Sequence, residues 1–223
     1  MNTNKTEQLL AYFLQFVTDN KKQKMNSVLA DRTRHVTIML ENLFQPHNAS
    51  AILRTCDLFG IQDVHVMQGE NKFQPITTIS MGAAKWLDTH QYTSTAESIA
   101  HLRSKGYKII ATTPHTTACD LPDLDFTEKT ALLFGTENIG LSQEALNLAD
   151  GFVKIPMHGF TESFNVSVSV ALCLYHARTI LTHSSPIPWQ LSPQEKTDIL
   201  LSWARRIVTA PELLEREFAK TNF

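Results

Sequence analysis

The strongest constraint on the fold is the alternation of short apolar segments with helical segments along the chain. Predicted strands lie at 36–40, 63–67, 108–112, 130–134 and 151–155, and predicted helices at 49–59, 95–105, 142–149 and 163–182. The strand segments are short and apolar, several of them rich in β-branched residues, and they are bounded by polar residues, which is typical of buried strands. A repeated strand–helix–strand order predicts an α/β domain on a mainly parallel sheet flanked by helices.

Helical segments flank this core at both ends. Residues 5–30 carry apolar side chains at three-to-four spacing, and 195–208 and 212–219 follow a linker rich in serine and proline. The last two helices are too short to fold alone, so they should dock on this subunit or on another. We expect an N-terminal helical extension over 1–35, the α/β core over 36–182, and a linker with C-terminal helices over 183–223.

The composition is that of a folded globular protein. Hydrophobic residues make up 43% and charged residues 19% of the 223 residues, which excludes a disordered or fibrous chain. The longest apolar run, Val166–Leu174, contains two serines and is far shorter than the roughly 20 residues of a membrane span. The first residues lack the pattern of a signal peptide. We therefore expect a cytoplasmic protein without a membrane partner.

The cysteines and histidines follow no metal-ligand pattern. Cys56, Cys119 and Cys173 are scattered and odd in number, so neither a disulfide framework nor a zinc site is expected. The nine histidines are dispersed, and no two of them are spaced as metal ligands beside a carboxylate. We therefore expect no metal.

The charge balance limits how the chain can bind nucleic acid. The formal net charge is −2, whereas nucleic-acid-binding domains are usually basic, so any RNA contact must be local. These side chains could also form ordinary solvated faces. The candidate basic patches are Lys21, Lys22, Lys24, Arg32 and Arg34 near the N-terminus, and Arg205 and Arg206 near the C-terminus.

A glycine-spaced loop follows the predicted strand at 130–134. The sequence Leu133-Phe-Gly-Thr-Glu-Asn-Ile-Gly-Leu-Ser142 nearly matches a phosphate-binding loop, but Leu141 stands where the essential lysine would be. No Gly-x-Gly-x-x-Gly fingerprint occurs elsewhere. Glycines at the end of a parallel strand let backbone groups approach a ligand closely. The loop therefore either binds a ligand or only shapes the strand–helix connection.

Two further segments carry polar residues next to predicted helix starts. Residues 155–169 read IPMHGFTESFNVSVS, in which Ser163 is a plausible helix cap and the small serines permit close helix packing. In residues 48–60, Asn48 is a plausible cap. Arg54 points away from the core face of the predicted helix, so it is either available for chemistry or paired on the surface with Asp57.

In order, spacing and residue type, these three segments resemble the motifs of the SpoU/TrmH methyltransferases over about residues 36–180. The resemblance implies a parallel α/β fold whose C-terminal segment makes a deep trefoil knot, and a homodimer with its site near the subunit interface. It implies S-adenosylmethionine as the cofactor. It also implies a cofactor pocket lined by Thr112, Leu133, Gly135, Ile155, Met157 and Phe164. The family more often has leucine at position 164, a volume change that should alter the fit more than the chemistry.

The same resemblance implies ribose 2′-O-methylation of RNA. It makes Arg54 the central catalytic residue, supported by Asn48, Glu137, Ser163 and Asn165. The short helical extensions are similar to those of family members that modify guanosine 18 of tRNA, so tRNA is the expected partner. The alternatives are a ribosomal RNA or another tRNA position as target, and a non-catalytic RNA-binding dimer of the same fold.

Overall fold

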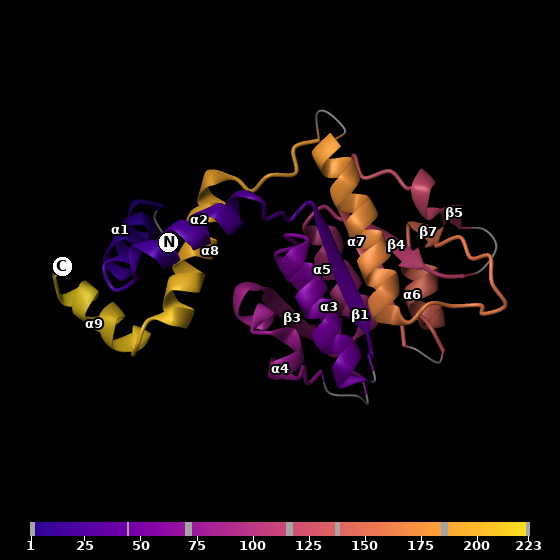
Figure 1. Ribbon diagram of the computed structural model, residues 1–223, viewed down its shortest axis with the longest axis horizontal. Coiled ribbons are helices and arrows are strands. Elements are labelled where there is room, and N and C mark those ends of the chain that lie inside the picture. The colour runs from indigo at the N-terminus through magenta and orange to yellow at the C-terminus, as the bar shows by residue number, and fades with distance from the viewer. Residues whose placement is uncertain are drawn as a thin grey trace. The chain divides into compact units, whose positions relative to one another are not determined.

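The chain folds into two compact units. One is Thr33–Trp189, and the other is formed by Met1–Arg32 together with Gln190–Phe223. The computed structural model (Figure 1) describes residues 3–43, 45–69, 73–114, 118–136, 139–183 and 187–221.

The larger unit is built on a seven-stranded sheet in the order β3-β2-β1-β6-β4-β7-β5, and all of its paired strands are parallel. The predicted α/β class with a parallel sheet is therefore confirmed. The strand order does not test the implied trefoil knot, which stays a prediction. The strands are β1 (Val36–Glu41), β2 (Asp63–Met67), β3 (Asp88–Tyr92), β4 (Lys108–Thr112), β5 (Cys119–Asp120), β6 (Thr130–Phe134) and β7 (Gly151–Lys154).

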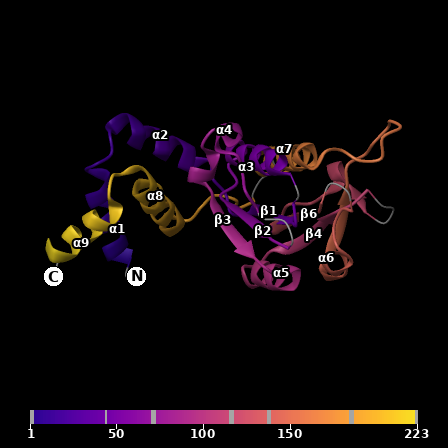
Figure 2. The same cartoon turned by 90° about the horizontal axis from the view of Figure 1, so that it is seen from below.

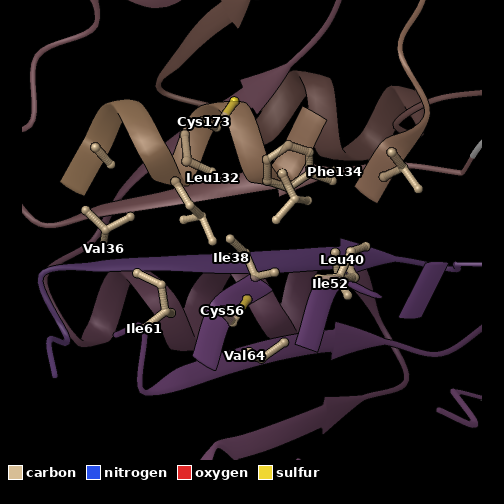
Figure 3. Packing of buried hydrophobic residues seen from close by; sticks show 14 of the residues in the cluster. Val36, Ile38, Leu40, Ile52, Cys56, Ile61, Val64, Leu132, Phe134 and Cys173 are labelled. Atoms are coloured by element: carbon tan, nitrogen blue, oxygen red, sulfur yellow. The ribbon is translucent and has the colours of Figure 1, made fainter. Parts of the chain in front are cut away.

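Helices cover both faces of this sheet. Figure 2 shows α3 (Pro46–Leu58), α4 (Thr77–Ser80) and α7 (Val166–His183) on one face, and α5 (Thr95–Ser104) and α6 (Gln143–Leu148) on the other. Successive side chains of β1 point to opposite faces of the sheet, so this strand contributes to the hydrophobic core on each face. Ile38 and Leu40 point toward α3 and α7 (Figure 3), whereas Met39 packs with residues of α5 and α6. Two short 3₁₀ helices, Ala83–Trp86 and Leu121–Asp123, complete the unit.

Two predicted helix starts were wrong. The helix expected at 49–59 begins at Pro46, because proline at the first helical position is already set to the helical φ angle. Asn48 therefore lies inside the first turn and does not cap it. The helix expected from Ser163 begins at Val166, and the side chain of Asn165 accepts the Ser167 N–H at 2.9 Å.

A cluster of aromatic and titratable side chains lies on β2, β3 and α5. The ring of His65 stacks on His90 and Tyr92, with centroids 4.7 and 5.8 Å apart. Burial, and then the neighbouring charge of His90, lower the pKa of His65 from 6.5 to about 3. The folded protein therefore keeps this histidine neutral at pH values at which the unfolded chain protonates it.

We expect the free energy of unfolding to fall as the pH drops from about 6.5 toward 3. The unfolded chain binds a proton throughout this range, whereas folded His65 binds it only near pH 3, so acid favours unfolding. The loss should be on the order of 2–3 kcal/mol between pH 7 and pH 4. Urea unfolding of His65→Phe against pH should give a flatter profile than the wild type. An equal flattening by His183→Gln, on the exposed end of α7, would contradict this.

The smaller unit is helical. Its helices α1 and α2 pack against α8, and α1 also packs against α9, around a core that includes Phe13, Leu201 and Phe218. Arg32 is fully buried with its guanidinium 5.4 Å from the Trp203 ring centroid. The bounds are α1 (Thr3–Leu14), α2 (Asp19–Ala30), α8 (Pro193–Ile207) and α9 (Pro211–Thr221).

The proposed basic patches are smaller than the sequence indicated. Arg32 is inside the helical unit. In the larger unit Arg34 pairs with Asp63 at 2.8 Å and Asp88 at 3.1 Å. Neither arginine is therefore available as a surface cation for RNA. None of the helices in the described part of the chain has the length and apolarity that crossing a membrane requires.

Candidate functional site

A cavity of about 590 Å³ lies at the carboxyl ends of three adjacent strands, β6, β4 and β7. Open parallel sheets bind their ligands at this position, and the volume is typical of small-molecule sites. Five of the six expected cofactor residues and two of the expected catalytic residues line it. These are Thr112, Gly135, Ile155, Met157 and Phe164, with Ser163 and Asn165.

The glycine loop after β6 forms one wall of the cavity. Its ends are tied together by two backbone hydrogen bonds of 3.0 Å between Thr136 and Gly140. A Cβ atom on Gly135 would lie 2.0 Å from the carbonyl carbon of Gly140, far below van der Waals contact, so no other residue fits there. Gly140 has a φ of +77°, which glycine adopts without strain. The two glycines therefore give the loop its shape and leave backbone groups at the cavity.

Leu133 is the one expected cofactor residue that the structure does not place in the cavity wall. It is fully buried and packs with the core on the α5 and α6 side of the sheet. Its carbonyl oxygen accepts a 2.7 Å hydrogen bond from the Thr112 hydroxyl. Leu133 therefore fixes the orientation of a residue that does line the cavity.

Three asparagine and glutamine side chains join the cavity to α3. Asn165 donates to the side-chain oxygen of Asn48 at 3.2 Å, and Asn48, which is buried, donates to Gln45 at 3.4 Å. Asn165 also fixes the start of α7, because its side-chain oxygen accepts from the Ser167 hydroxyl at 2.6 Å. Gln45 and Asn165 line the cavity, and Asn48 holds them from behind.

Arg54 lies apart from the cavity of its own chain. It is exposed on α3 and is not one of the described residues that line the cavity. Among the residues that the structure describes, the side chain of Arg54 has no hydrogen bond or ion pair, so it forms no surface pair with Asp57. The guanidinium is therefore open to a ligand or to another chain. Glu137, the remaining expected catalytic residue, lies outside the described residues.

Several residues that line the cavity were not expected from the sequence. Gln45 precedes α3, Ser169 lies in the first turn of α7, and Glu162 lies in the irregular segment before α7. Glu162 and Ser169 belong to the segment 155–169, so their position in that motif could have identified them as cavity residues. No sequence pattern marks Gln45, which is joined to Asn165 through the hydrogen bonds of Asn48.

The cavity fits a positively charged organic cofactor. Among its described lining residues Glu162 is the only charged side chain, so no cation there would repel a sulfonium group. Apolar side chains such as Ile155, Leu146 and Phe164 can hold a flat ring, while the loop backbone supplies polar groups. S-adenosylmethionine has this combination of features. Within the described residues, no group of three or more histidine, cysteine or carboxylate side chains could hold a metal ion.

Comparisons with known proteins identify relatives that are methyltransferases, as the cavity indicates. Residues 35–175 match the model of the SpoU rRNA Methylase family. A tRNA (guanosine(18)-2′-O)-methyltransferase of Borreliella burgdorferi is 40% identical over 200 residues, which cover 90% of this chain and 91% of the relative. The matches therefore extend well beyond the motifs that line the cavity.

Two solved structures are similar in fold. The TrmH/SpoU tRNA modifying enzyme of A. aeolicus has a TM-score of 0.78 at 28% identity, covering 86% of this chain and 98% of the other. The SpoU methyltransferase AviRb of Streptomyces viridochromogenes, in complex with the cofactor AdoMet, has a TM-score of 0.61 at 27% identity, covering 69% and 63%. Since the family model covers more than half of the residues and the bacterial relative is matched over nearly its whole length, the chain belongs to the SpoU rRNA methylase family.

Proposed function

We propose that the protein transfers a methyl group from S-adenosylmethionine to a ribose 2′-hydroxyl of tRNA in the cytoplasm, at guanosine 18 in the D-loop. The cavity at the carboxyl ends of β6, β4 and β7 carries this proposal, since it brings the glycine loop together with Ser163 and Asn165. The name of the Borreliella burgdorferi relative supports the tRNA target. The AdoMet complex of AviRb supports the cofactor.

The proposed mechanism divides the work between two sets of residues. When bound, S-adenosylmethionine supplies a methyl group on a positively charged sulfur. Thr112, Gly135, Ile155, Met157 and Phe164 would hold it, with Leu133 behind Thr112. Ser163 and Asn165 would orient the ribose at the cavity, and Asn48 would keep Asn165 in place.

Arg54 would act on the nucleotide and not on the cofactor. The planar guanidinium suits a bidentate grip on the phosphate next to the target ribose. Its five N–H groups are all donors, so the guanidinium would position and neutralise the phosphate and would not act as the base. Glu137 would support the positioning of the reacting groups.

The proposed function is tested by methyl transfer and by binding. Labelled methyl groups should pass from S-adenosylmethionine to unmodified total tRNA and not to ribosomal RNA, and nucleotide mapping should place the modification at guanosine 18. Calorimetry should show that S-adenosylmethionine binds without RNA, because the described residues that line the cavity all belong to the protein itself. No binding of either the cofactor or its demethylated product would contradict the enzymatic proposal.

We also propose that the protein is a homodimer formed through α3 and α7. These helices lie side by side on one face of the sheet (Figures 1 and 2). The exposed side of α7 carries Val168, Leu172 and Tyr175 at helical spacing, 43%, 37% and 64% exposed, and Leu58 of α3 is 74% exposed. Such a contiguous apolar surface favours an interface. Arg54 lies one turn before Leu58, so pairing through this surface would bring it to the second subunit, and we propose that it acts there.

Introducing a charge on this surface should separate the subunits. We expect wild-type protein to sediment at about twice the chain mass at micromolar concentration and Leu172→Glu to sediment as a monomer. An unpaired buried carboxylate costs several kcal/mol. The matched control is Asn147→Glu, which adds the same charge on α6 at an exposed position on the other face of the sheet. A fully active wild-type monomer would contradict the proposed interface.

A further inference from the structure

One buried carboxylate joins three elements at the carboxyl edge of the sheet. Glu41 is the last residue of β1, and only 3% of its surface is exposed. One of its oxygens accepts hydrogen bonds from the hydroxyls of Thr95 (2.6 Å) and Ser142 (2.7 Å). The other oxygen accepts from the backbone N–H of Ser142 at 2.7 Å. Short bonds to a buried carboxylate are strong ones, so this is a firmly held junction.

The two partners of Glu41 belong to different parts of the structure. Thr95 is the first residue of α5, which lies outside the cavity. Ser142 follows Leu141 directly, and Leu141 is the last cavity-lining residue of the glycine loop. Ser142 is also the cap of α6, because its hydroxyl accepts the Ala145 N–H at 3.1 Å. Glu41 therefore holds the point at which the loop rejoins the body of the fold.

Glu41 also lies next to the segment that leads into α3. Asn42 has a φ of +51°, an uncommon value for a residue other than glycine, and its N–H donates to the carbonyl of Met67 at 2.9 Å. The chain turns here toward the helix that carries Asn48 and Arg54. Glu41 therefore lies five residues before the helix that carries two of the expected catalytic residues.

We propose that Glu41 is a positioning residue that holds the glycine loop in its cofactor-binding conformation. This inference rests on the proposed function of the cavity. The bonds between Thr136 and Gly140 close the turn internally, but the bonds to Glu41 fix its downstream end to the sheet. If the loop loosens, only a fraction of the molecules has a competent cavity, and the apparent affinity for the cofactor falls by that fraction.

The chain offers a matched pair of variants for the test. Glu41→Gln keeps the shape but cannot accept all three bonds, because one of its terminal atoms is a donor. Thr95→Val removes one bond to the same carboxylate without touching the loop. We expect Glu41→Gln to weaken S-adenosylmethionine binding in calorimetry about tenfold, which is about 1.4 kcal/mol. Backbone amides of 139–142 should also exchange hydrogen faster in the cofactor-free protein. Thr95→Val should stay within about twofold of wild type in both measurements.

Several results would overturn the role of Glu41. Equal effects of the two variants would make it a general structural residue, and unchanged binding and exchange in Glu41→Gln would remove it from the site. If Glu41→Gln does not fold, Ser142→Gly takes its place, because it removes the hydroxyl on the loop side while glycine is a tolerated helix cap. Its effect should then exceed that of Thr95→Val. Absence of binding to wild-type protein would instead contradict the proposed function.

Discussion

Replacing Arg54 with lysine should lower the single-turnover rate of methyl transfer by about 10²–10³ and leave the affinity for S-adenosylmethionine nearly unchanged. Lysine keeps the positive charge but lacks the planar fork that can grip a phosphate with two parallel hydrogen bonds. Loss of one well-placed electrostatic contact in a closed site typically has an effect of about this size. Binding should persist because Arg54 does not line the cavity of its own chain. Single-turnover assays and calorimetry on the same preparation measure the two quantities.

The control for this prediction is Asp57→Ala. The two side chains are one turn apart on α3 but form no ion pair in the described part of the structure, and even an exposed pair of this kind would be worth at most about 1 kcal/mol and would not affect turnover. Asp57→Ala should therefore methylate tRNA at close to the wild-type rate, with circular dichroism showing that both variants are folded. A near wild-type rate for Arg54→Lys, or an equal loss for Asp57→Ala, would move the catalytic role to another residue.

The central strands were predicted well because helices cover both faces of a parallel sheet and so bury its strands completely. Strands buried on both faces consist almost entirely of apolar residues, and β6 (TALLF) is a clear example. The edge strand β3, with the sequence DTHQY, was missed because it is polar and half-exposed. Its position is set by backbone pairing with β2, which leaves no hydrophobic pattern to detect.

Only those site residues that belong to a local sequence motif could be predicted. The glycine loop and the segment around Ser163 were found from residue type and spacing. The bond between Asn48 and Asn165 joins residues 117 positions apart, and the Glu41–Ser142 bonds join residues 101 positions apart. No local pattern encodes such contacts, because they depend on how the strands are ordered in the sheet. The placement of Leu133 behind the cavity follows from the same cause.

Gly135→Ala should reduce the affinity for S-adenosylmethionine by at least about 100-fold. The added Cβ would lie 2.0 Å from the Gly140 carbonyl carbon and 2.2 Å from the Leu141 nitrogen, both of which are backbone atoms. The loop must therefore shift by more than 1 Å, and a displacement of that size in a positioned site typically has an effect of about 10². The matched control is Gly106→Ala, whose φ of +81° makes it strained but whose Cβ meets nothing within 4 Å. Calorimetry should show normal cofactor binding for the control.

Mixing the two disabled variants tests which subunit supplies Arg54. An Arg54→Lys chain keeps its cavity, and a Gly135→Ala chain keeps its arginine. If Arg54 acts on the cavity of the partner, a mixed dimer has one complete site, made of the Arg54→Lys cavity and the arginine of the Gly135→Ala chain. Random exchange of subunits at equal amounts makes about half of the dimers mixed, so about a quarter of the wild-type sites should regain activity. If Arg54 acts on its own cavity, every site in the mixture lacks either the arginine or the cofactor loop. The mixture would then be no more active than its two components, and the proposed assembly of the site across the interface would be wrong.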